Sequence, residues 1–324
     1  LIDAFEQVEA ARGEHSLSYF EFGTLAALWI AAKYSPDVLL LEVGLGGRLD
    51  AVNILPHDVA IVTNVSMDHM EWLGDSLSAI AIEKAGIARP GKPLITADND
   101  MPTSFYTEAD RHGATVLRAG REFNVERNAD SWSYISDVMQ YRQMPMPGIK
   151  GAHQINNAAC ALTAIACLQE RLPVNDACTR QALTETKLAG RFEQISASPP
   201  IYLDVAHNPA AARELPALLA RLRHDGNIIA VMAMQSNRDI STFVQPLIND
   251  FAAWHVSPLA CGMGHNVTDI ETAIFGLRAD VPVVCHDTVA AAIASAQGQL
   301  AGEDCMVIFG SFYTVSEACA ALHV

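Results

Sequence analysis

Apolar and polar residues follow two alternating patterns along this chain. Short, continuously apolar runs rich in leucine and β-branched residues are separated by longer segments whose apolar positions recur with the period of a helix. Residues 38–43 and 59–65 have the unbroken apolar pattern of strands that are covered on both faces of a parallel sheet. Residues 76–85 have the pattern of a helix, with Ser76 or the aspartate before it as N-cap and Gly86 where the helix ends. This alternation predicts an α/β fold built on parallel strands.

The middle of the chain is less regular. Residues 116–149 carry several aromatic residues and two prolines, and they predict a hairpin or a small sheet. Two helices are predicted at residues 153–172 and 174–187. The helical pattern then ends on glycine within residues 188–191, and a new series of strands begins. We therefore expect two domains, over residues 1–189 and 190–324.

After Gly190, five apolar runs predict strands, and each run is followed by a helical segment. This order is typical of a doubly wound, Rossmann-like domain. No internal repeat or low-complexity tract interrupts the chain, which excludes a solenoid. The five predicted strands are residues 201–205, 228–232, 254–257, 281–285 and 306–309.

Composition narrows the range of functions. Half of the 324 residues are apolar and 18% are charged, which is enough apolar material for two buried cores. The formal net charge of −16 repels polyanions, so we expect no nucleic-acid partner. No apolar run approaches the roughly 20 residues of a membrane span, so we expect no membrane partner. Seven cysteines without a Cys-x-x-Cys pair predict buried thiols in a reducing compartment, the cytoplasm, rather than disulfides or a zinc site.

A glycine-rich segment follows the first predicted strand. Glu42 stands at the carboxyl end of that strand, where ligands of α/β sheets collect, and Gly44, Gly46 and Gly47 come directly after it. The segment could be a tight turn in which Glu42 accepts hydrogen bonds from backbone amides, or a site where a cation meets the carboxylate. A dinucleotide-binding loop fits less well, because Leu49 occupies the position of its third glycine.

Two more groups in the first domain could carry chemistry. Asp68 and His69 follow the second predicted strand, so Glu42 and His69 could converge from neighbouring strand ends and offer the ligands that Mg²⁺ or Mn²⁺ accepts. A lone histidine after a strand could equally be a loop residue with its own hydrogen bonds. Lys84 lies at the end of an apolar helix, where it could extend into solvent or have the lowered pKa that covalent chemistry requires.

The second domain offers one motif, residues 204–209, where a strand passes into a helix. Asn208 suits the N-cap of that helix and Pro209 its first position, so local structure explains both residues. Local structure does not explain Asp204 and His207, which stand at the ligand edge of the sheet. Packing and function both remain open for these two residues.

As an ordered set, these motifs resemble the dihydrofolate synthase/folylpolyglutamate synthase family of the Mur ligase superfamily. The matches run in family order across essentially the whole chain, which is far more specific than a single glycine-rich motif. They comprise residues 19–24, 41–53, 68–69, 72–74, 83–87, 153–154, 157–158, 190–193, 204–209 and 310–312.

The resemblance implies a fold and a reaction. The first domain would be a Mur-ligase-like central domain with a mostly parallel sheet, and the second a glutamate-ligase domain with a Rossmann-like fold. The enzyme would use ATP to phosphorylate the carboxylate of dihydropteroate or a folate, and the amine of L-glutamate would then displace phosphate. Its partners would be these small molecules, and we expect a cytoplasmic monomer.

The resemblance also implies roles for single residues. Glu42 and His69 would bind Mg²⁺ or Mn²⁺, and Lys84 would be the catalytic lysine that this superfamily carbamylates. The ATP contacts would be Asn157, Arg191 and Asp204, with His207 as a catalytic residue beside the nucleotide. The pteroate site would be lined by Ser18, Tyr19, Phe20, Glu21 and Leu49.

One departure from the family pattern is serious. The family's Gly-Thr-Asn-Gly-Lys phosphate loop has no match here, since Gly91-Lys92 is followed by Pro93 and lacks the upstream glycine. We therefore expect a first domain without its N-terminal part, an apolar surface or open sheet edge beside residues 38–43, and an inactive fragment. Three alternatives remain: a cell-wall Mur-type amino-acid ligase, a non-catalytic remnant that binds pteroate or a protein, and, more distantly, a dehydrogenase.

Overall fold

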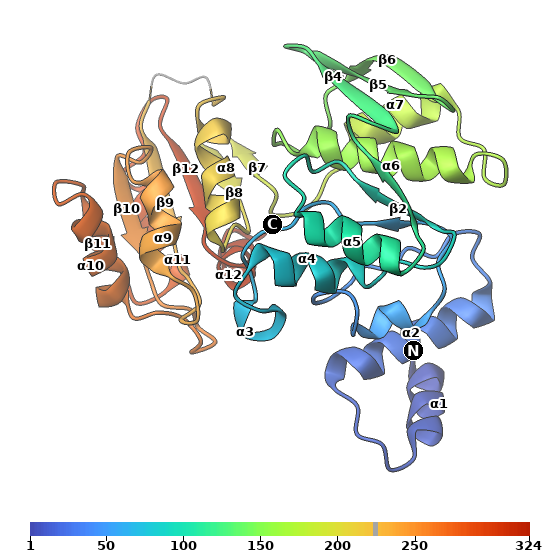
Figure 1. The fold of residues 1–324 in the computed structure, drawn as a ribbon. Helices are drawn as coiled ribbons and strands as arrows, with labels where there is room; N and C mark the ends of the chain where they lie inside the picture. The colour runs from blue at the N-terminus through green and yellow to red at the C-terminus, as the bar shows by residue number, and fades with distance from the viewer. Residues whose placement is uncertain (223–225) are drawn as a thin grey trace. The chain divides into compact units, whose positions relative to one another are not determined.

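The computed structural model describes residues 1–222 and 226–324, which fold into two compact units (Figure 1). The first unit comprises residues 1–144 and 159–174, and the second comprises residues 145–158 and 175–324. Helix α6 (Gln154–Leu168) therefore contributes its first turn to the second unit and the rest to the first. The second unit also includes residues 175–189, which the sequence pattern assigned to the first domain.

The first unit contains a parallel three-stranded sheet in the order β1 (Ala60–Ile61), β2 (Pro93–Thr96) and β3 (Thr115–Arg118). Two helices connect these strands and lie side by side over the sheet, α4 (Leu77–Ala85) and α5 (Thr103–Arg111) (Figure 1). Their apolar faces share one core, and the helix predicted at residues 76–85 is confirmed with Ser76 as its N-cap and Gly86 as its C-cap.

Residues 38–43 do not form the predicted strand, and only Ala60–Ile61 of the predicted strand 59–65 is regular. The side chains of Val38, Leu39, Leu40 and Leu41 are 36–90% exposed, so an apolar surface is present where we expected one. A strand requires a neighbour for its backbone hydrogen bonds, and no described strand pairs with residues 38–43. The apolar run alone therefore does not produce a strand.

Two further groups of elements belong to the first unit. Helices α1 (Ile2–Arg12) and α2 (Tyr19–Tyr34) pack together through a small core. A second sheet, in the order β4 (Phe123–Arg127), β5 (Ser131–Ser136) and β6 (Gln140–Pro145), confirms the small sheet predicted within residues 116–149. Shorter pieces are η1 (Ala51–Ile54) and α3 (Met70–Leu73).

The second unit contains a six-stranded sheet in the order β11-β10-β9-β12-β8-β7, with parallel pairing throughout except between β7 and β8. All five predicted strands are confirmed, with bounds shifted by up to two residues. The antiparallel strand β7 was not predicted. The strands are β7 (Glu193–Ala197), β8 (Pro200–Leu203), β9 (Ile228–Met232), β10 (Ala253–Val256), β11 (Val283–Cys285) and β12 (Cys305–Phe309).

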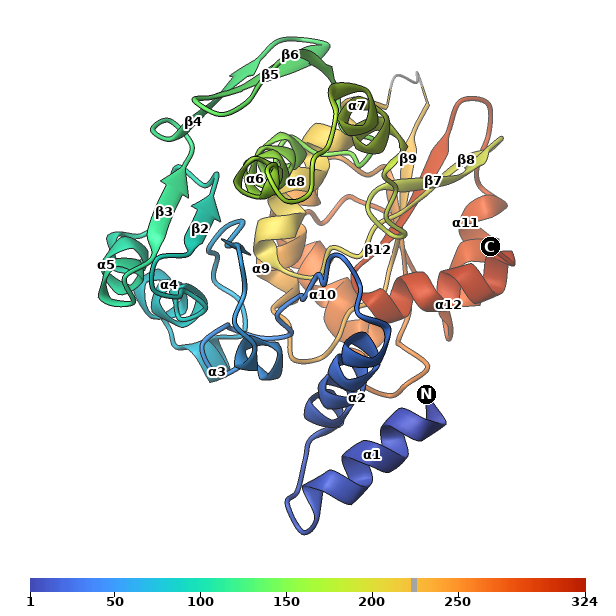
Figure 2. The same cartoon turned by 90° about the vertical axis from the view of Figure 1, so that its right-hand side faces the viewer.

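Helices cover both faces of this sheet, as a doubly wound fold requires (Figure 2). One face packs against α8 (Pro209–Leu219), α9 (Ile240–Val244) and α10 (Val267–Leu277), and the other against α11 (Val289–Gln297) and α12 (Phe312–Leu322). Helix α7 (Asp176–Glu185) and the short η2 (Gln245–Leu247) complete the unit, and the two helices predicted at residues 153–172 and 174–187 are confirmed in shorter form as α6 and α7.

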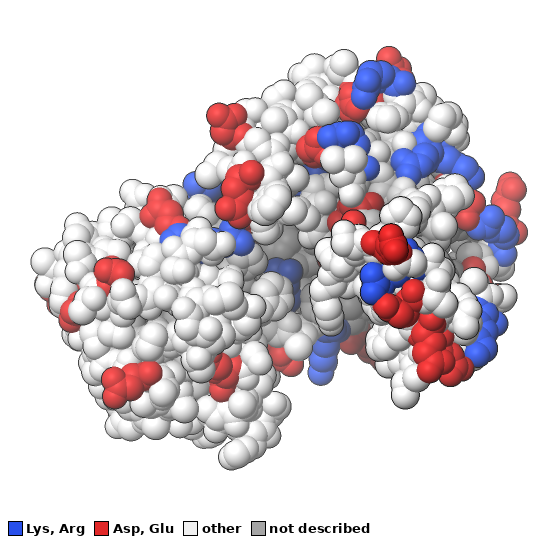
Figure 3. Space-filling view, turned by 90° about the horizontal axis from the view of Figure 1, so that it is seen from below, with Lys and Arg blue, Asp and Glu red and all other residues white. Residues whose placement is uncertain are grey.

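The prediction that the cysteines are buried is wrong for most of them. All seven thiols are free, but only Cys160 and Cys305 are buried, and Cys167, Cys178, Cys261 and Cys285 are exposed. The cysteines have mostly apolar neighbours in sequence, which favoured the prediction, but such neighbours do not imply burial, because adjacent residues of a helix or strand point in different directions. Among the described helices, none is long and apolar enough to cross a membrane. On the face seen in Figure 3, acidic and basic side chains are interspersed.

Candidate active site

The glycine-rich segment after residue 43 is a compact loop organised by Asp50. One carboxylate oxygen of Asp50 accepts hydrogen bonds from the backbone N–H groups of Gly44 and Leu45, at 3.0 and 2.9 Å. The other oxygen accepts from the N–H of Val52 at 3.0 Å and caps η1. Asp50 therefore has the role that one interpretation of the sequence gave to Glu42, whose side chain is exposed.

The glycines of this loop allow it to lie directly against the end of α4. A Cβ atom on Gly47 would lie 2.8 Å from the carbonyl oxygen of Glu83, which is too close for any other residue. The N–H of Arg48 donates to the same carbonyl at 2.9 Å. The Arg48 guanidinium also pairs with the Glu83 carboxylate, with Nη2 2.9 Å from Oε1. Close packing thus explains Gly47 without a ligand.

A cavity of about 320 Å³ opens beside the loop. Four of the five residues predicted to bind pteroate line it, whereas Tyr19 is 97% exposed and does not. Trp72, Leu73 and Glu83 have no predicted role, although all three lie in segments that carry the family resemblance. The lining residues are Ser18, Phe20, Glu21, Leu45, Gly46, Gly47, Arg48, Leu49, Asp50, Ala51, Trp72, Leu73 and Glu83.

The start of α2 forms part of the lining of the cavity and is fixed by a capping box. The side chain of Ser18 accepts a hydrogen bond from the N–H of Glu21 at 3.2 Å, and the Glu21 carboxylate accepts from the N–H of Ser18 at 2.7 Å. This reciprocal capping box leaves these two side chains little freedom. The ring of Phe20 lies so close to Gly44 that a Cβ there would be 2.7 Å from it.

The two predicted metal ligands are both exposed. His69 is the N-cap of α3 and lies in the left-handed backbone region (φ 51°). Its backbone N–H donates a hydrogen bond to the carboxylate of Asp68 at 2.8 Å. Among the residues that the structure describes, no hydrogen bond or ion pair joins Glu42 to His69, and no three carboxylate, imidazole or thiol groups form a metal cluster. The expected convergence rested on a strand at residues 38–43, so a shared cation remains a prediction.

Lys84 occupies the last turn of α4 and is partly buried. Burial lowers the pKa of its amine, and the nearby Asp68 carboxylate acts in the opposite direction. A lower pKa increases the neutral fraction of the amine, which is the form that attacks carbon dioxide. The carbamate on Lys84 itself remains a prediction.

In the second unit, Asp204 follows β8 and is 8% exposed. One carboxylate oxygen accepts from the N–H of Phe192 at 2.9 Å and the other from the N–H of Ala206 at 2.7 Å. Burial raises the pKa of Asp204, while these two hydrogen bonds and the charges of Arg191 and His153 act to lower it. Arg191 itself is exposed, so the structure brings a buried carboxylate close to an accessible guanidinium.

His207 and Asn157 lie in the same unit. The Nδ1 atom of His207 is 2.9 Å from the carbonyl oxygen of Val205, and since a carbonyl can only accept, Nδ1 carries the hydrogen. The Asn157 amide donates to the side-chain oxygen of Gln154 at 3.0 Å. The predicted local roles of Asn208 and Pro209, which follow His207, are confirmed. The side chain of Asn208 caps α8, and Pro209 is the first residue of that helix.

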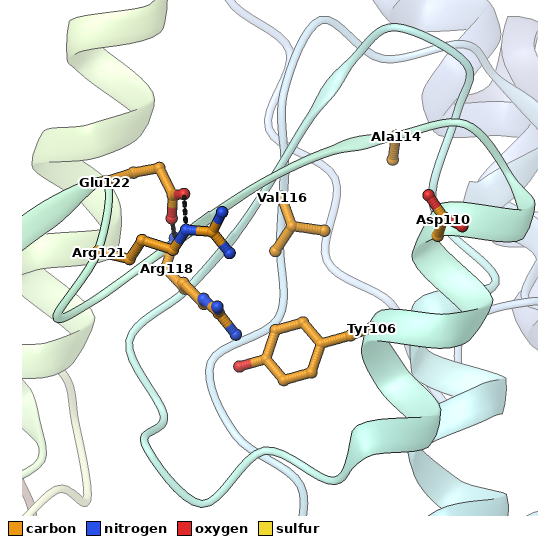
Figure 4. A pocket seen from close by; sticks show the side chains of 7 residues that line it. All are labelled: Tyr106, Asp110, Ala114, Val116, Arg118, Arg121 and Glu122. Carbon is orange, nitrogen blue, oxygen red and sulfur yellow. Dashed lines mark hydrogen bonds and ion pairs between the residues drawn. The ribbon is translucent and has the colours of Figure 1, made fainter.

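A second cavity, of about 270 Å³, lies between α5 and β3 in the first unit (Figure 4). The guanidinium of Arg118 stands over the ring of Tyr106, 5.0 Å from its centre. Glu122 accepts a hydrogen bond from the N–H of Arg118 and pairs with Arg121. No residue predicted from sequence lines this cavity.

Comparison with known proteins places both parts of the chain. Residues 13–165 match the Mur ligase middle domain, and residues 190–312 match the Mur ligase glutamate ligase domain. The dihydrofolate synthase/folylpolyglutamate synthase of Escherichia coli K12 is 36% identical over 313 residues, which are 97% of this chain and 71% of that protein.

Solved structures agree with this relationship. The structure of E. coli FolC in complex with DHPP and ADP matches with a TM-score of 0.91 and 35% identity, over 99% of this chain and 74% of that one. A bifunctional folylpolyglutamate synthase/dihydrofolate synthase with Mn, AMPPNP and L-glutamate bound matches with a TM-score of 0.89 and 37% identity, over 99% and 75%. The chain belongs to the dihydrofolate synthase/folylpolyglutamate synthase family of Mur ligases.

Proposed function

We propose that this protein is an ATP-dependent ligase that joins L-glutamate to dihydropteroate and to folates. A carboxylate oxygen of the folate substrate attacks the γ-phosphorus of ATP, which yields an acyl phosphate and ADP. The amine nitrogen of L-glutamate then attacks the acyl carbon, the amide forms, and phosphate and a proton leave. The bound DHPP, ADP, AMPPNP and L-glutamate in the related structures support this assignment.

The observation that carries the proposal is the cavity beside the glycine loop. It combines an aromatic and apolar wall with carboxylates, which suits a flat pteridine with hydrogen-bond donors at its edge. Leu49 and Trp72 are 79% and 73% exposed, so a ligand lying on them would bury a large apolar area. Phe20 and the capped start of α2 give their part of the lining a fixed shape.

Glu42 and His69 are proposed to hold a divalent cation, with a carbamate on Lys84 as a further oxygen donor. Carboxylate, imidazole and carbamate form a donor set that accepts Mg²⁺ or Mn²⁺. Mg²⁺ commonly takes only one or two protein groups and completes its shell with phosphates and water, so a pair of exposed side chains is sufficient. When bound, the cation neutralises the charge that develops on the transferred phosphoryl group.

The carbamate would form when the neutral Lys84 amine attacks carbon dioxide and releases one proton. Partial burial favours this reaction, because it lowers the pKa of the lysine. The Asp68 carboxylate, which accepts a hydrogen bond from the backbone N–H of His69, also lies close enough to Lys84 to affect the pKa of its amine. The end of α4 and the loop before α3 are thereby linked within one unit.

In the second unit, Arg191 is proposed to bind the ATP phosphates, with Asn157 and Asp204 as further nucleotide contacts. The Asp204 carboxylate is held by two backbone N–H groups, which fixes its position beside Arg191. His207 would present Nε2 as an acceptor, because Nδ1 carries the hydrogen. His207 is thus suited to accept the proton that the glutamate amine loses.

Several finer expectations belong to this proposal. We expect a monomer in the cytoplasm that binds neither nucleic acid nor membrane; the seven free thiols support a reducing compartment. We also expect both folate activities. The domain boundary between residues 189 and 190 is proposed from the sequence, and the start of the glutamate ligase domain match at residue 190 supports it.

Because the sequence predicts that these residues alone are inactive, the proposal is tested on a protein that also carries the family's phosphate loop, with ADP release measured separately with dihydropteroate plus glutamate and with tetrahydrofolate plus glutamate. Binding is tested independently of turnover by titrating dihydropteroate and following the fluorescence of Trp72. We expect saturable quenching that is lost in Trp72→Phe, while calorimetry still detects binding by that variant. Absence of binding by calorimetry would refute the pteroate site, and binding without ADP release would refute the reaction.

A further inference from the structure

An ion pair joins the glycine loop to the end of α4 across 35 positions of sequence. The Arg48 Nε atom lies 3.1 and 3.2 Å from the two carboxylate oxygens of Glu83, and Nη2 lies 2.9 Å from one of them. This two-nitrogen geometry fixes the direction of both side chains. We propose that Arg48 and Glu83 are positioning residues that hold Lys84 in place beside the cavity. The proposal rests on the proposed role of Lys84 as the carbamylated lysine.

The pair acts on Lys84 through the backbone of the last helical turn. Glu83 precedes Lys84, and its carbonyl oxygen accepts the N–H of Arg48. Carbonyl groups in a last turn lack partners within the helix, so an external donor of this kind orders the turn. The N–H of Gly86 closes the turn on the other side by donating to the carbonyl oxygens of Ile82 and Lys84.

A second connection ties the loop to the residues after Lys84. The Asn53 side-chain amide donates to the carbonyl oxygens of Arg48 and Gly86, at 3.1 and 3.3 Å. Arg89 donates in turn to the backbone and side-chain oxygens of Asn53, at 2.5 and 2.7 Å. Lys84 therefore lies in a turn that is held to the loop on both sides, and the ion pair is the part of this connection that faces the cavity.

Because the Arg48–Glu83 pair is partly exposed to solvent, its effect on the position of Lys84 can be distinguished from its effect on the stability of the fold. The side chains of Arg48 and Glu83 are 44% and 24% exposed, so water screens their attraction and the pair contributes little to the stability of the fold. Loss of the ion pair should therefore displace Lys84 while leaving the melting temperature nearly unchanged. The chain offers a matched control in Arg171, which forms a comparable exposed pair with Asp58 in the same unit.

The test uses the full chain with ¹³C-labelled bicarbonate and measures the carbamate by ¹³C NMR, with Lys84→Met identifying its signal. At one fixed bicarbonate concentration, Arg48→Met and Glu83→Gln should each reduce the signal by about threefold or more, and the double variant should lose no more than either single one, because coupled residues are not additive. Arg48→Lys should restore part of the signal. Arg171→Met should leave it unchanged, and all variants should melt within about 3 °C of the wild type.

Two results would overturn the proposal: an undiminished signal in Arg48→Met and Glu83→Gln, or losses that simply add in the double variant. If the wild type itself shows no carbamate, the proposed role of Lys84 fails, and the rate of reductive methylation of Lys84, followed by mass spectrometry, decides the positioning role. Faster methylation in both variants than in the wild type and Arg171→Met would support positioning. Equal rates would refute it.

Discussion

Replacing Asp204 by asparagine separates the structural role of this buried carboxylate from its proposed nucleotide contact. The two oxygens of Asp204 accept from the N–H groups of Phe192 and Ala206. An asparagine of the same shape retains one of these bonds and turns its NH₂ group toward the other N–H. Leaving one buried N–H unpaired costs about 1–3 kcal/mol of unfolding free energy. Removing a buried charge offsets part of this loss.

The pH dependence of stability shows whether the charge on Asp204 stabilises or destabilises the folded protein. Burial raises the pKa of Asp204 in the folded state, so the folded protein binds its proton more readily than the unfolded chain. The contribution of this group to stability is therefore lost as the pH rises through the raised pKa, and is regained on acidification toward the ordinary aspartate pKa. We expect the wild type to gain stability relative to Asp204→Asn as the pH falls.

The assay is urea denaturation of both proteins at several pH values, with calorimetric ATP titration at neutral pH. Asp239 is the control, because hydrogen bonds from the Thr242 side chain and backbone lower its pKa, so the wild type should lose stability relative to Asp239→Asn on acidification. At neutral pH, the free energy of unfolding of Asp204→Asn should be lower than that of the wild type by up to about 3 kcal/mol. The variant should also bind ATP at least about tenfold more weakly. A gap between wild type and Asp204→Asn that narrows on acidification would refute the electrostatic reasoning, and unchanged ATP affinity would reject the nucleotide contact.

Three further substitutions test the remaining sites, and a fourth serves as a control. Arg191→Ala should weaken ATP binding by about tenfold in calorimetry without lowering the melting temperature, because an exposed guanidinium contributes a charge-assisted bond to the ligand rather than to the fold; unchanged affinity would reject the contact. In a protein that also carries the family's phosphate loop, Lys84→Ala should lose ligase turnover and regain part of it with a small carboxylic acid in place of the carbamate; a fully active Lys84→Ala protein would end the carbamate hypothesis. Gly47→Ala should destabilise the fold by about 1–3 kcal/mol, because its Cβ meets the Glu83 carbonyl oxygen at 2.8 Å. Gly23→Ala, inside α2 with open space around it, should stabilise by about 0.5–1 kcal/mol, and equal effects in urea denaturation would contradict this reasoning.

Helix ends and the central strands of the second unit followed from the sequence alone. Helix α4 begins after Ser76 and ends at Gly86 as predicted, and α8 begins at Asn208 and Pro209. These ends are predictable because a cap depends on residues within one turn of each other. The strands of the second unit are continuous apolar runs, which is a local property of chains buried on both faces. The order of the motifs was sufficient to indicate the family.

Only the tertiary structure decided the features that join distant residues. Residues 38–43 have a strand pattern but no described strand beside them, and β7 is a strand because it pairs with β8 rather than because of its own pattern. Asp50 rather than Glu42 organises the glycine loop. Arg48 meets Glu83 across 35 residues, and no local pattern encodes that contact. Local sequence determines conformation through neighbours a few residues apart, whereas the pairing of strands and charges depends on the path of the whole chain.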